Sequence, residues 1–263
     1  MSRCRSGRAV LAGAAVIALA GCGSAGGTSP AASNRPAGAA SSPAGTAGAA
    51  GATGASPGSS VAAASIPFPI AVGTTWIYDV KTNLSQLHAP DTKRVVGVTP
   101  VPGGRQVTMA DCLGPAESAI NTVEHYLFYD NGQIGFPVSD AHGVSVVSSS
   151  GVVWPDAAGL ASGRSYHSVL NVKLSSGRYD TANVTVQGGG TQSVSVPAGT
   201  YRATLVTMTM VMKVGSFTST AVVKAWTAAG TGPVKTEELI SAAGKTELIT
   251  TSALVSFTKQ AGS

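Results

Sequence analysis

From about residue 66 onward, apolar and polar residues alternate along the chain, and β-branched residues dominate the alternating segments. Successive side chains of a strand point to opposite faces, so this period predicts strands with one buried face. Residues 66–263 are numerous enough to enclose a substantial hydrophobic core in one domain. The sequence therefore predicts an all-β fold with minor helix.

Each predicted strand is a run of alternating residues that ends at a Gly-, Ser- or Asn-containing turn signal. These strands are Thr74–Thr82, Thr92–Pro100, Arg105–Cys112, Thr122–Asp130, Tyr166–Leu174, Tyr179–Gln187, Thr191–Val196, Thr200–Val214, Phe217–Thr227, Pro233–Ile240 and Lys245–Phe257. Predicted turns include Asp130-Asn131-Gly132 and Gly188-Gly189-Gly190, and helical turns are expected only within Pro115–Ile120 and Trp154–Ala161. The pattern predicts a single antiparallel β domain that forms a half-barrel, a barrel or a curved sheet.

The motif Leu19-Ala20-Gly21-Cys22 ends an apolar stretch, Val10–Ala20, which follows Arg3, Arg5 and Arg8. This stretch is too short to cross a membrane as a helix, which needs about 20 residues. It resembles the signal peptides of bacterial lipoproteins, in which small residues precede the cleavage site. The resemblance implies a signal peptide over residues 1–21, and acylation of Cys22 with chains such as palmitate. It also implies a lipid-anchored position on the extracytoplasmic face of the cell membrane.

Between Cys22 and the alternating region, residues 22–65 consist almost wholly of Gly, Ala, Ser, Thr and Pro, with Arg35 the single charge. Such a composition buries too little apolar surface to offset the entropy of ordering, so the sequence predicts a disordered tether. A flexible chain of this length has a root-mean-square span of roughly 35 Å.

Charge and cysteine content narrow the partners that we expect. Cleavage before Cys22 lowers the net charge from +5 to +2, and residues 66–263 carry 13 basic against 12 acidic residues. No basic block remains in this part of the sequence, so nucleic acid is not expected as a partner. Cys112 is the one cysteine left beside the acylated Cys22, and an intramolecular disulfide is therefore not expected.

Three motifs of the β region occur together in a recognisable order. They are Phe68–Tyr78, with its Pro-x-x-x-Gly-x-x-Trp-x-Tyr pattern, Val194–Tyr201 with Val-Pro-Ala-Gly-Thr-Tyr, and Ala225–Lys235 with Trp and a Gly-x-Gly pair. The trio resembles uncharacterised exported bacterial β proteins, and is similar to domains related to the curved sheets of periplasmic lipid-carrier lipoproteins. Thr231 and Pro233 depart from the usual form of the third motif. The resemblance implies a fold and brings no catalytic residue.

The segment Val206–Val214 places Met208, Met210 and Met212 on one face of a strand, spaced about 7 Å apart. Methionine repacks readily around irregular shapes, so these residues are candidate ligand-binding residues for a lipid or another apolar molecule. The alternatives are a core-facing strand and, because thioethers are soft ligands, a Cu(I) site.

Residues with catalytic or metal-binding chemistry form no recognisable motif. His88, His125, His142 and His167 lack the spacing of a metal site, so neither a metal nor another cofactor is expected. Glu237-Glu238, next to Lys235, is typical of a solvated strand edge. Hydrolase motifs are missing from the sequence, and an enzyme is therefore not expected.

Together these patterns predict a membrane-anchored extracytoplasmic lipoprotein. We expect a non-enzymatic binding module for an apolar or amphipathic envelope ligand. The alternative is a structural or protein-interaction lipoprotein of the cell envelope, with another envelope protein as its partner. An internal apolar cavity favours the first function, and a filled interior favours the second.

Overall fold

The computed structural model describes residues 68–83, 87–114, 122–139, 145–174, 176–214, 217–242 and 245–260. The predicted signal peptide, the predicted acylation site Cys22, the predicted tether and the expected helical segment Pro115–Ile120 all lie outside the described residues.

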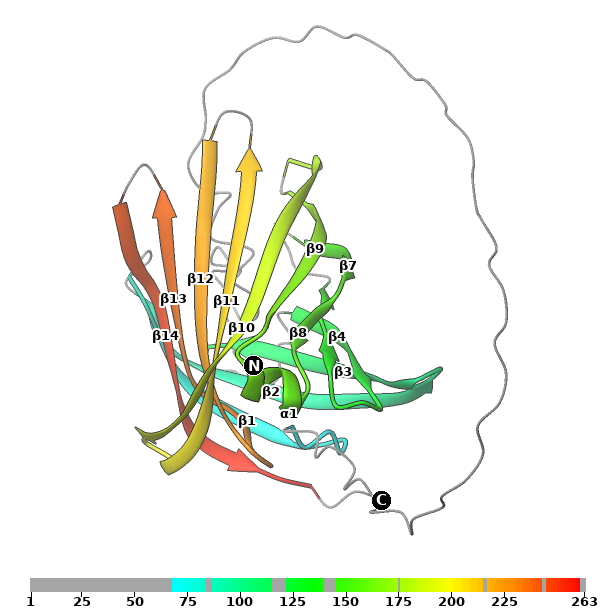
Figure 1. Cartoon of the computed structure of the whole chain (residues 1–263). Helices are drawn as coiled ribbons and strands as arrows, with labels where there is room; N and C mark the ends of the chain where they lie inside the picture. Colours follow the sequence, from blue (N-terminus) through cyan, green and yellow to red (C-terminus); the bar gives the residue numbers. More distant parts are fainter. Residues whose placement is uncertain are drawn as a thin grey trace, which may run out of the picture.

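The described part of the chain forms one 14-stranded antiparallel sheet that curls into a nearly closed barrel (Figure 1). Its elements are β1 (Thr75–Thr82), β2 (Leu87–Val101), β3 (Gly104–Leu113), β4 (Thr122–Tyr129), β5 (Ile134–Gly135), β6 (Val138–Ser139), β7 (Ser145–Ser150), β8 (Val152–Trp154), α1 (Ala157–Ser162), β9 (Ser165–Lys173), β10 (Tyr179–Val196), β11 (Gly199–Val214), β12 (Phe217–Ala228), β13 (Gly232–Ala242) and β14 (Lys245–Thr258). The strand order is β7-β9-β10-β11-β12-β13-β14-β1-β2-β3-β4-β5-β8, and β6 pairs with β4. The predicted fold class is therefore confirmed, with the barrel as the form that the sheet takes.

Strand β1 shows how the alternation builds the core. Trp76, Tyr78 and Val80 are 2%, 4% and 0% exposed, as the predicted shared face requires. These side chains join the main hydrophobic cluster inside the barrel. Strand β1 pairs with β14 on one side and with β2 on the other, so its inward residues lie where the two halves of the sheet join.

Tyr179–Gln187 and Thr191–Val196, predicted as two strands, form the single strand β10. The other predicted strands end within five residues of their expected ends, whereas the sequence does not predict β5, β6, β7 and β8. Three of these four strands have only two or three residues, too few to show a period. Helix α1 begins after Asp156, whose carboxylate accepts a hydrogen bond from the Gly159 amide at 2.7 Å.

The predicted turn at Gly188-Gly189-Gly190 is wrong. Strand β10 continues through these residues, and the register with β11 shifts there as in a β-bulge. A side chain at Gly188 would meet the Leu160 carbonyl oxygen at 2.6 Å, so glycine allows α1 to pack closely on the strand. Gly188 therefore serves helix packing, whereas a side chain at Gly189 would meet Leu205 of β11 at 2.9 Å.

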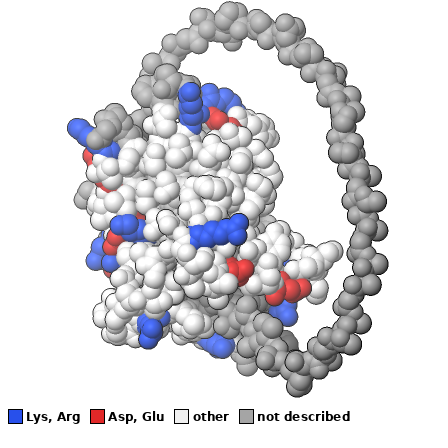
Figure 2. Space-filling view, in the orientation of Figure 1, with Lys and Arg blue, Asp and Glu red and all other residues white. Residues whose placement is uncertain are grey.

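The surface carries few charges. On the part of one face that the described residues form, acidic and basic side chains lie in small mixed groups separated by broad uncharged areas (Figure 2). This distribution agrees with a charged-residue content of 11%. The expectation that the protein does not bind nucleic acid stays a prediction.

A hydrogen bond and close packing hold the turn between β12 and β13 against the barrel interior. The Trp76 indole donates a hydrogen bond to the Thr231 carbonyl at 2.5 Å. Gly232 adopts a φ of +95°, and a side chain there would lie 3.0 Å from the Phe68 ring and 3.4 Å from the Trp76 nitrogen. The first and third sequence motifs thus meet at this turn, because Gly232 leaves room for Phe68 and Trp76 of the first motif.

We predict that Gly232→Ala destabilises the protein more than Gly230→Ala. Both glycines have positive φ, which costs alanine about 1–2 kcal/mol. Alanine at Gly232 also displaces Phe68, which adds about 1–3 kcal/mol, whereas nothing lies within 4 Å of a side chain at Gly230. Urea unfolding of the full chain measures both variants, and equal losses would contradict this account of the turn.

Candidate functional site

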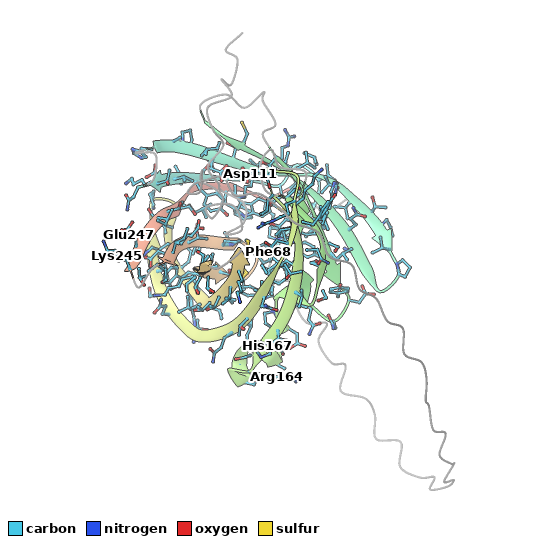
Figure 3. All side chains as sticks on the ribbon, turned by 90° about the horizontal axis from the view of Figure 1, so that it is seen from above. Phe68, Asp111, Arg164, His167, Lys245 and Glu247 are labelled. Carbon is cyan, nitrogen blue, oxygen red and sulfur yellow. The ribbon has the colours of Figure 1, made fainter. Side chains whose placement is uncertain are left out.

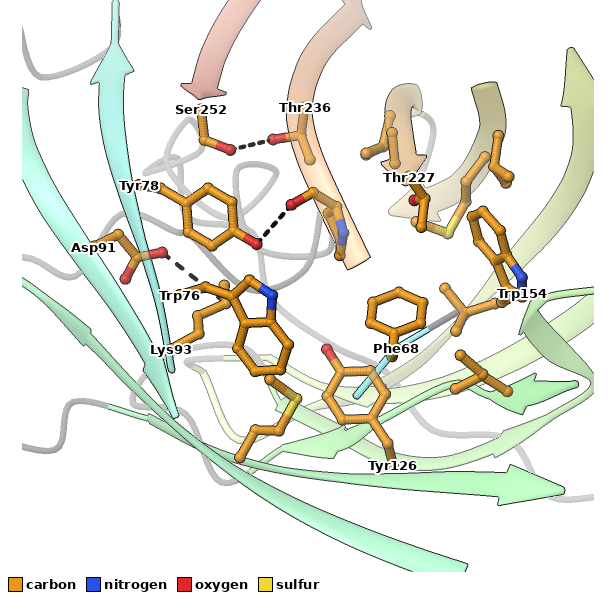
Figure 4. Close-up of a pocket in the computed structure, with 18 of the residues that line it drawn as sticks. Phe68, Trp76, Tyr78, Asp91, Lys93, Tyr126, Trp154, Thr227, Thr236 and Ser252 are labelled. Carbon is orange, nitrogen blue, oxygen red and sulfur yellow. Dashed lines mark hydrogen bonds and ion pairs between the residues drawn. The ribbon is translucent and has the colours of Figure 1, made fainter. Parts of the chain in front are cut away.

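A cavity of about 240 Å³ lies inside the barrel, lined by side chains from β1–β5, β8 and β11–β14. Figure 3 looks into the barrel from above, and Figure 4 shows the cavity in close-up. Most lining residues are apolar, and six of them are aromatic: Phe68, Trp76, Tyr78, Tyr126, Phe128 and Trp154. An internal space with this lining is typical of a site for a small apolar or amphipathic ligand.

Phe68 lies at the centre of the aromatic wall (Figure 4). Its ring packs edge-on against Phe128 and Trp154, with centroid distances of 6.1 and 6.0 Å. Such perpendicular contacts are favoured because the positive ring edge meets a negative ring face. The segment that enters the barrel before β1 therefore contributes directly to the wall of the cavity.

The three candidate methionines share one face of β11, but they take different positions. Met208 lines the cavity. Met210 and Met212 are each 1% exposed in the hydrophobic core and are not among the lining residues. Ligand binding by these three residues stays a prediction. Of the three, Met208 is the one that lies at the cavity wall, where it can contact a ligand.

Hydrogen bonds hold the cavity wall in shape at the sites of the sequence motifs. The Tyr78 hydroxyl donates to the Pro233 carbonyl at 2.9 Å. The turn of the second motif is fixed by the Ala198 amide, which donates to the Leu254 carbonyl at 2.9 Å. The motifs therefore fix the sheet around the cavity, and the first motif supplies three of the six aromatic residues that line it.

A group of ionisable side chains lies in the interior on β2, β3 and β4, and three of its members, Asp91, Lys93 and Tyr126, line the cavity. Lys93 forms an ion pair with Asp111, and its ammonium nitrogen lies 4.0 Å from an Asp91 carboxylate oxygen. The Tyr126 hydroxyl donates to Glu124 at 2.8 Å. The inward alternation of three adjacent strands brings these residues together, and register rather than sequence spacing determines their contacts.

Burial is the largest influence on the pKa values of Asp91 and Glu124 in this group. Burial raises the pKa of Asp91 to about 9, although the Lys93 charge acts in the opposite direction. Burial likewise raises the pKa of Glu124 to about 7, opposed by Lys93 and by the hydrogen bond from Tyr126. Burial therefore favours the protonated form of both carboxyls, and Lys93 favours the charged form.

A row of five inward side chains crosses β11, β12, β13, β14 and β1 through successive register pairs. Its members are Met208, Val223, Glu238, Thr250 and Thr82. The first four line the cavity, and Thr82 is buried at the end of the row. The row therefore changes from apolar to polar across one wall of the barrel.

Glu238 corrects the interpretation of Glu237-Glu238 as a solvated strand edge. Strand β13 lies between β12 and β14, and Glu238 points inward with 8% of its surface exposed. Glu237 faces outward and forms an ion pair with Lys235 at 2.7 Å. Burial raises the pKa of Glu238 from its ordinary value of 4.5 to about 7. Successive strand residues face opposite sides, so the two neighbours have opposite environments.

The histidines of the described residues lie away from the cavity lining. His88 pairs with Asp79, and the ring nitrogens of His125 and His167 lie 3.2 Å from the hydroxyls of Thr108 and Thr185. His142 lies outside the described residues. No group of three or more potential metal ligands occurs in the described ranges.

The predicted cleavage residues Leu19, Ala20 and Gly21 and the predicted lipidation site Cys22 are also outside the described ranges. Cys112 lies within them and is buried, with 7% of its surface exposed. Among the residues described, none belongs to a helix with the length and hydropathy required to span a bilayer.

Comparison with known proteins finds similarity over part of the chain. Residues 155–253 match the model of a family described as DUF3108-like, so the second and third sequence motifs fall inside the matched region and the first falls outside it. No curated protein matches the chain.

Two solved structures have a TM-score of 0.48 to this chain, and each covers 74% of it. The first is a protein assigned as exported, with a YmcC-like fold, from Bacteroides fragilis NCTC 9343; it is 18% identical and covered over 100% of its length. The second is assigned as a lipoprotein from Parabacteroides distasonis ATCC 8503; it is 14% identical and covered over 99%.

We predict that stability falls as pH rises from about 4.5 to about 8, and that Glu238→Gln reduces this fall. The folded Glu238 carboxyl holds its proton up to about pH 7, whereas an unfolded one releases it near 4.5. Folding is therefore penalised across this window, by roughly 3 kcal/mol for this residue once it is fully ionised. Glu124 and Asp91 act in the same direction, so part of the slope remains in the variant.

Urea unfolding of the full chain near pH 5 and near pH 8 tests the effect. The matched control is Glu237→Gln, which changes the outward neighbour and leaves the slope as in the wild type. A slope in Glu238→Gln identical to that of the wild type would contradict the assignment.

Proposed function

We propose that this protein is an extracytoplasmic lipoprotein, anchored through acylated Cys22, whose β domain is a non-enzymatic module that binds an apolar or amphipathic envelope ligand. The observation that carries the proposal is the cavity of about 240 Å³ inside the barrel. The lipoprotein-like leader and the resemblance to exported β proteins support the location. The cavity supports binding because a purely structural barrel of this size gains stability by filling its interior.

The size of the cavity limits the ligand. Its volume lies just below the roughly 300–1,000 Å³ of typical small-molecule sites, which suits a short acyl chain or a single ring system. Each methylene group that moves from water into such a site contributes about 0.8 kcal/mol. The aromatic wall and Met208 supply the apolar contacts, with Met208 able to adjust to the shape of the ligand.

The test is to purify the full chain from native membranes and to identify co-purifying small molecules by native mass spectrometry. We predict a stoichiometric ligand in the wild type and its loss in Ala225→Phe, because Ala225 lines the cavity and a phenyl ring there occupies its space. The control is Val222→Phe, which adds the same ring on the outer face of β12 and retains the ligand.

Circular dichroism and urea unfolding establish that both variants are folded before their ligand content is compared. An empty wild-type domain that also takes up no added apolar probe would overturn the proposal. That result would favour the structural or protein-interaction function that the sequence offers as the alternative.

A further inference from the structure

Three neighbouring members of the row across β13, β14 and β1 carry buried oxygen atoms without a hydrogen-bond partner. They are Glu238 Oε1, Thr250 Oγ1 and Thr82 Oγ1. Their residues are 8%, 7% and 3% exposed, and they are joined by the register pairs Glu238–Thr250 and Thr82–Thr250. A buried polar atom without a partner has lost its hydration and gained no hydrogen bond in exchange, and most buried polar atoms in proteins are paired. Three adjacent unpaired oxygens therefore point to a group that the ligand provides.

The chemistry of these oxygens favours a donor with positive charge. Within the described ranges, no ion pair involves Glu238, and burial alone accounts for its raised pKa. Asp91 differs because the Lys93 ammonium already lies 4.0 Å from its carboxylate. A carboxylate that is buried without a counter-ion is stabilised most by a cation that reaches it.

The polar and apolar parts of the wall are arranged for a ligand with two ends. Met208 and Val223 stand beside Glu238 in the same row. In the next row, the hydroxyls of Thr236 and Ser252 bond to each other at 2.7 Å and leave no comparable demand (Figure 4). Thr227 Oγ1 and Asp91 Oδ1 also line the cavity without a hydrogen-bond partner. Among the described lining residues, Glu238 and Thr250 are the two with unpaired oxygens that are register neighbours, so they form the pair that one ligand group can reach.

We propose that the ligand is a single-chain amphiphile with an ammonium head, bound by Glu238 and Thr250 with Thr82 behind them, while its chain lies against Met208 and the aromatic wall. This inference rests on the proposed function of the cavity. An ammonium group has three N–H donors, enough for both the Glu238 carboxylate and the Thr250 hydroxyl at the cavity wall. A carboxylate or phosphate head would bring a second negative charge to Glu238 and is disfavoured.

Three eight-carbon compounds with different head groups test the proposal: octylamine, octanol and octanoate. Isothermal titration near pH 8 uses the full chain in lipid nanodiscs, with empty nanodiscs as the reference for partitioning. We expect octylamine to bind more tightly than octanol, and octanoate to bind most weakly. Glu238→Gln lowers the affinity for octylamine by about 10- to 100-fold, the range for a lost hydrogen bond to a charged group.

The same variant leaves octanol affinity nearly unchanged, because glutamine keeps the shape and the hydrogen-bonding oxygen of Glu238. Glu237→Gln, one residue away on the outer face, leaves all three affinities unchanged. Octanoate binding as tight as octylamine, or an unaltered octylamine affinity in Glu238→Gln, would overturn the head-group assignment alone. Failure of all three compounds to bind the wild type would overturn the proposed function and this inference with it.

Discussion

The pairing of β1 with β14 is the contact on which the cavity depends. It runs from Thr75–Thr258 to Thr82–Thr250, and it joins the side of the sheet that holds β2–β5 and β8 to the side that holds β7 and β9–β14. Without it, the aromatic wall of β4 and β8 and the row of β11–β13 would belong to separate sheets. Trp76 and Tyr78 strengthen this junction, because their polar atoms bond to carbonyls of Thr231 and Pro233 beyond β14.

The interior combines features that oppose stability with features that suit binding. An unfilled space forfeits packing contacts, and a buried carboxyl such as Glu238 is costly to ionise. Both costs fall on the same wall, where β11 to β14 line the cavity. A ligand that fills the space and pairs the oxygens relieves both costs together, and mass action then stabilises the folded state.

The sequence predicts the long strands well because β-branched alternation over eight or more residues is determined locally. It misses β5, β6 and β8, since two or three residues show no period, and it places a turn at Gly188–Gly190, where Gly188 instead serves helix packing. The site is harder to predict. Glu238 is next to an exposed glutamate in sequence, and only the position of β13 between two strands shows that it is buried.

Phe68 connects the expected anchor to the cavity. It is the first described residue, it follows the predicted tether, and its ring packs against Phe128 and Trp154 in the cavity wall. The proposed tether, with a root-mean-square span of roughly 35 Å, would keep the barrel close to the membrane to which Cys22 is expected to be attached. An amphiphile that leaves the bilayer would then have a short path to the cavity, whose wall begins at Phe68.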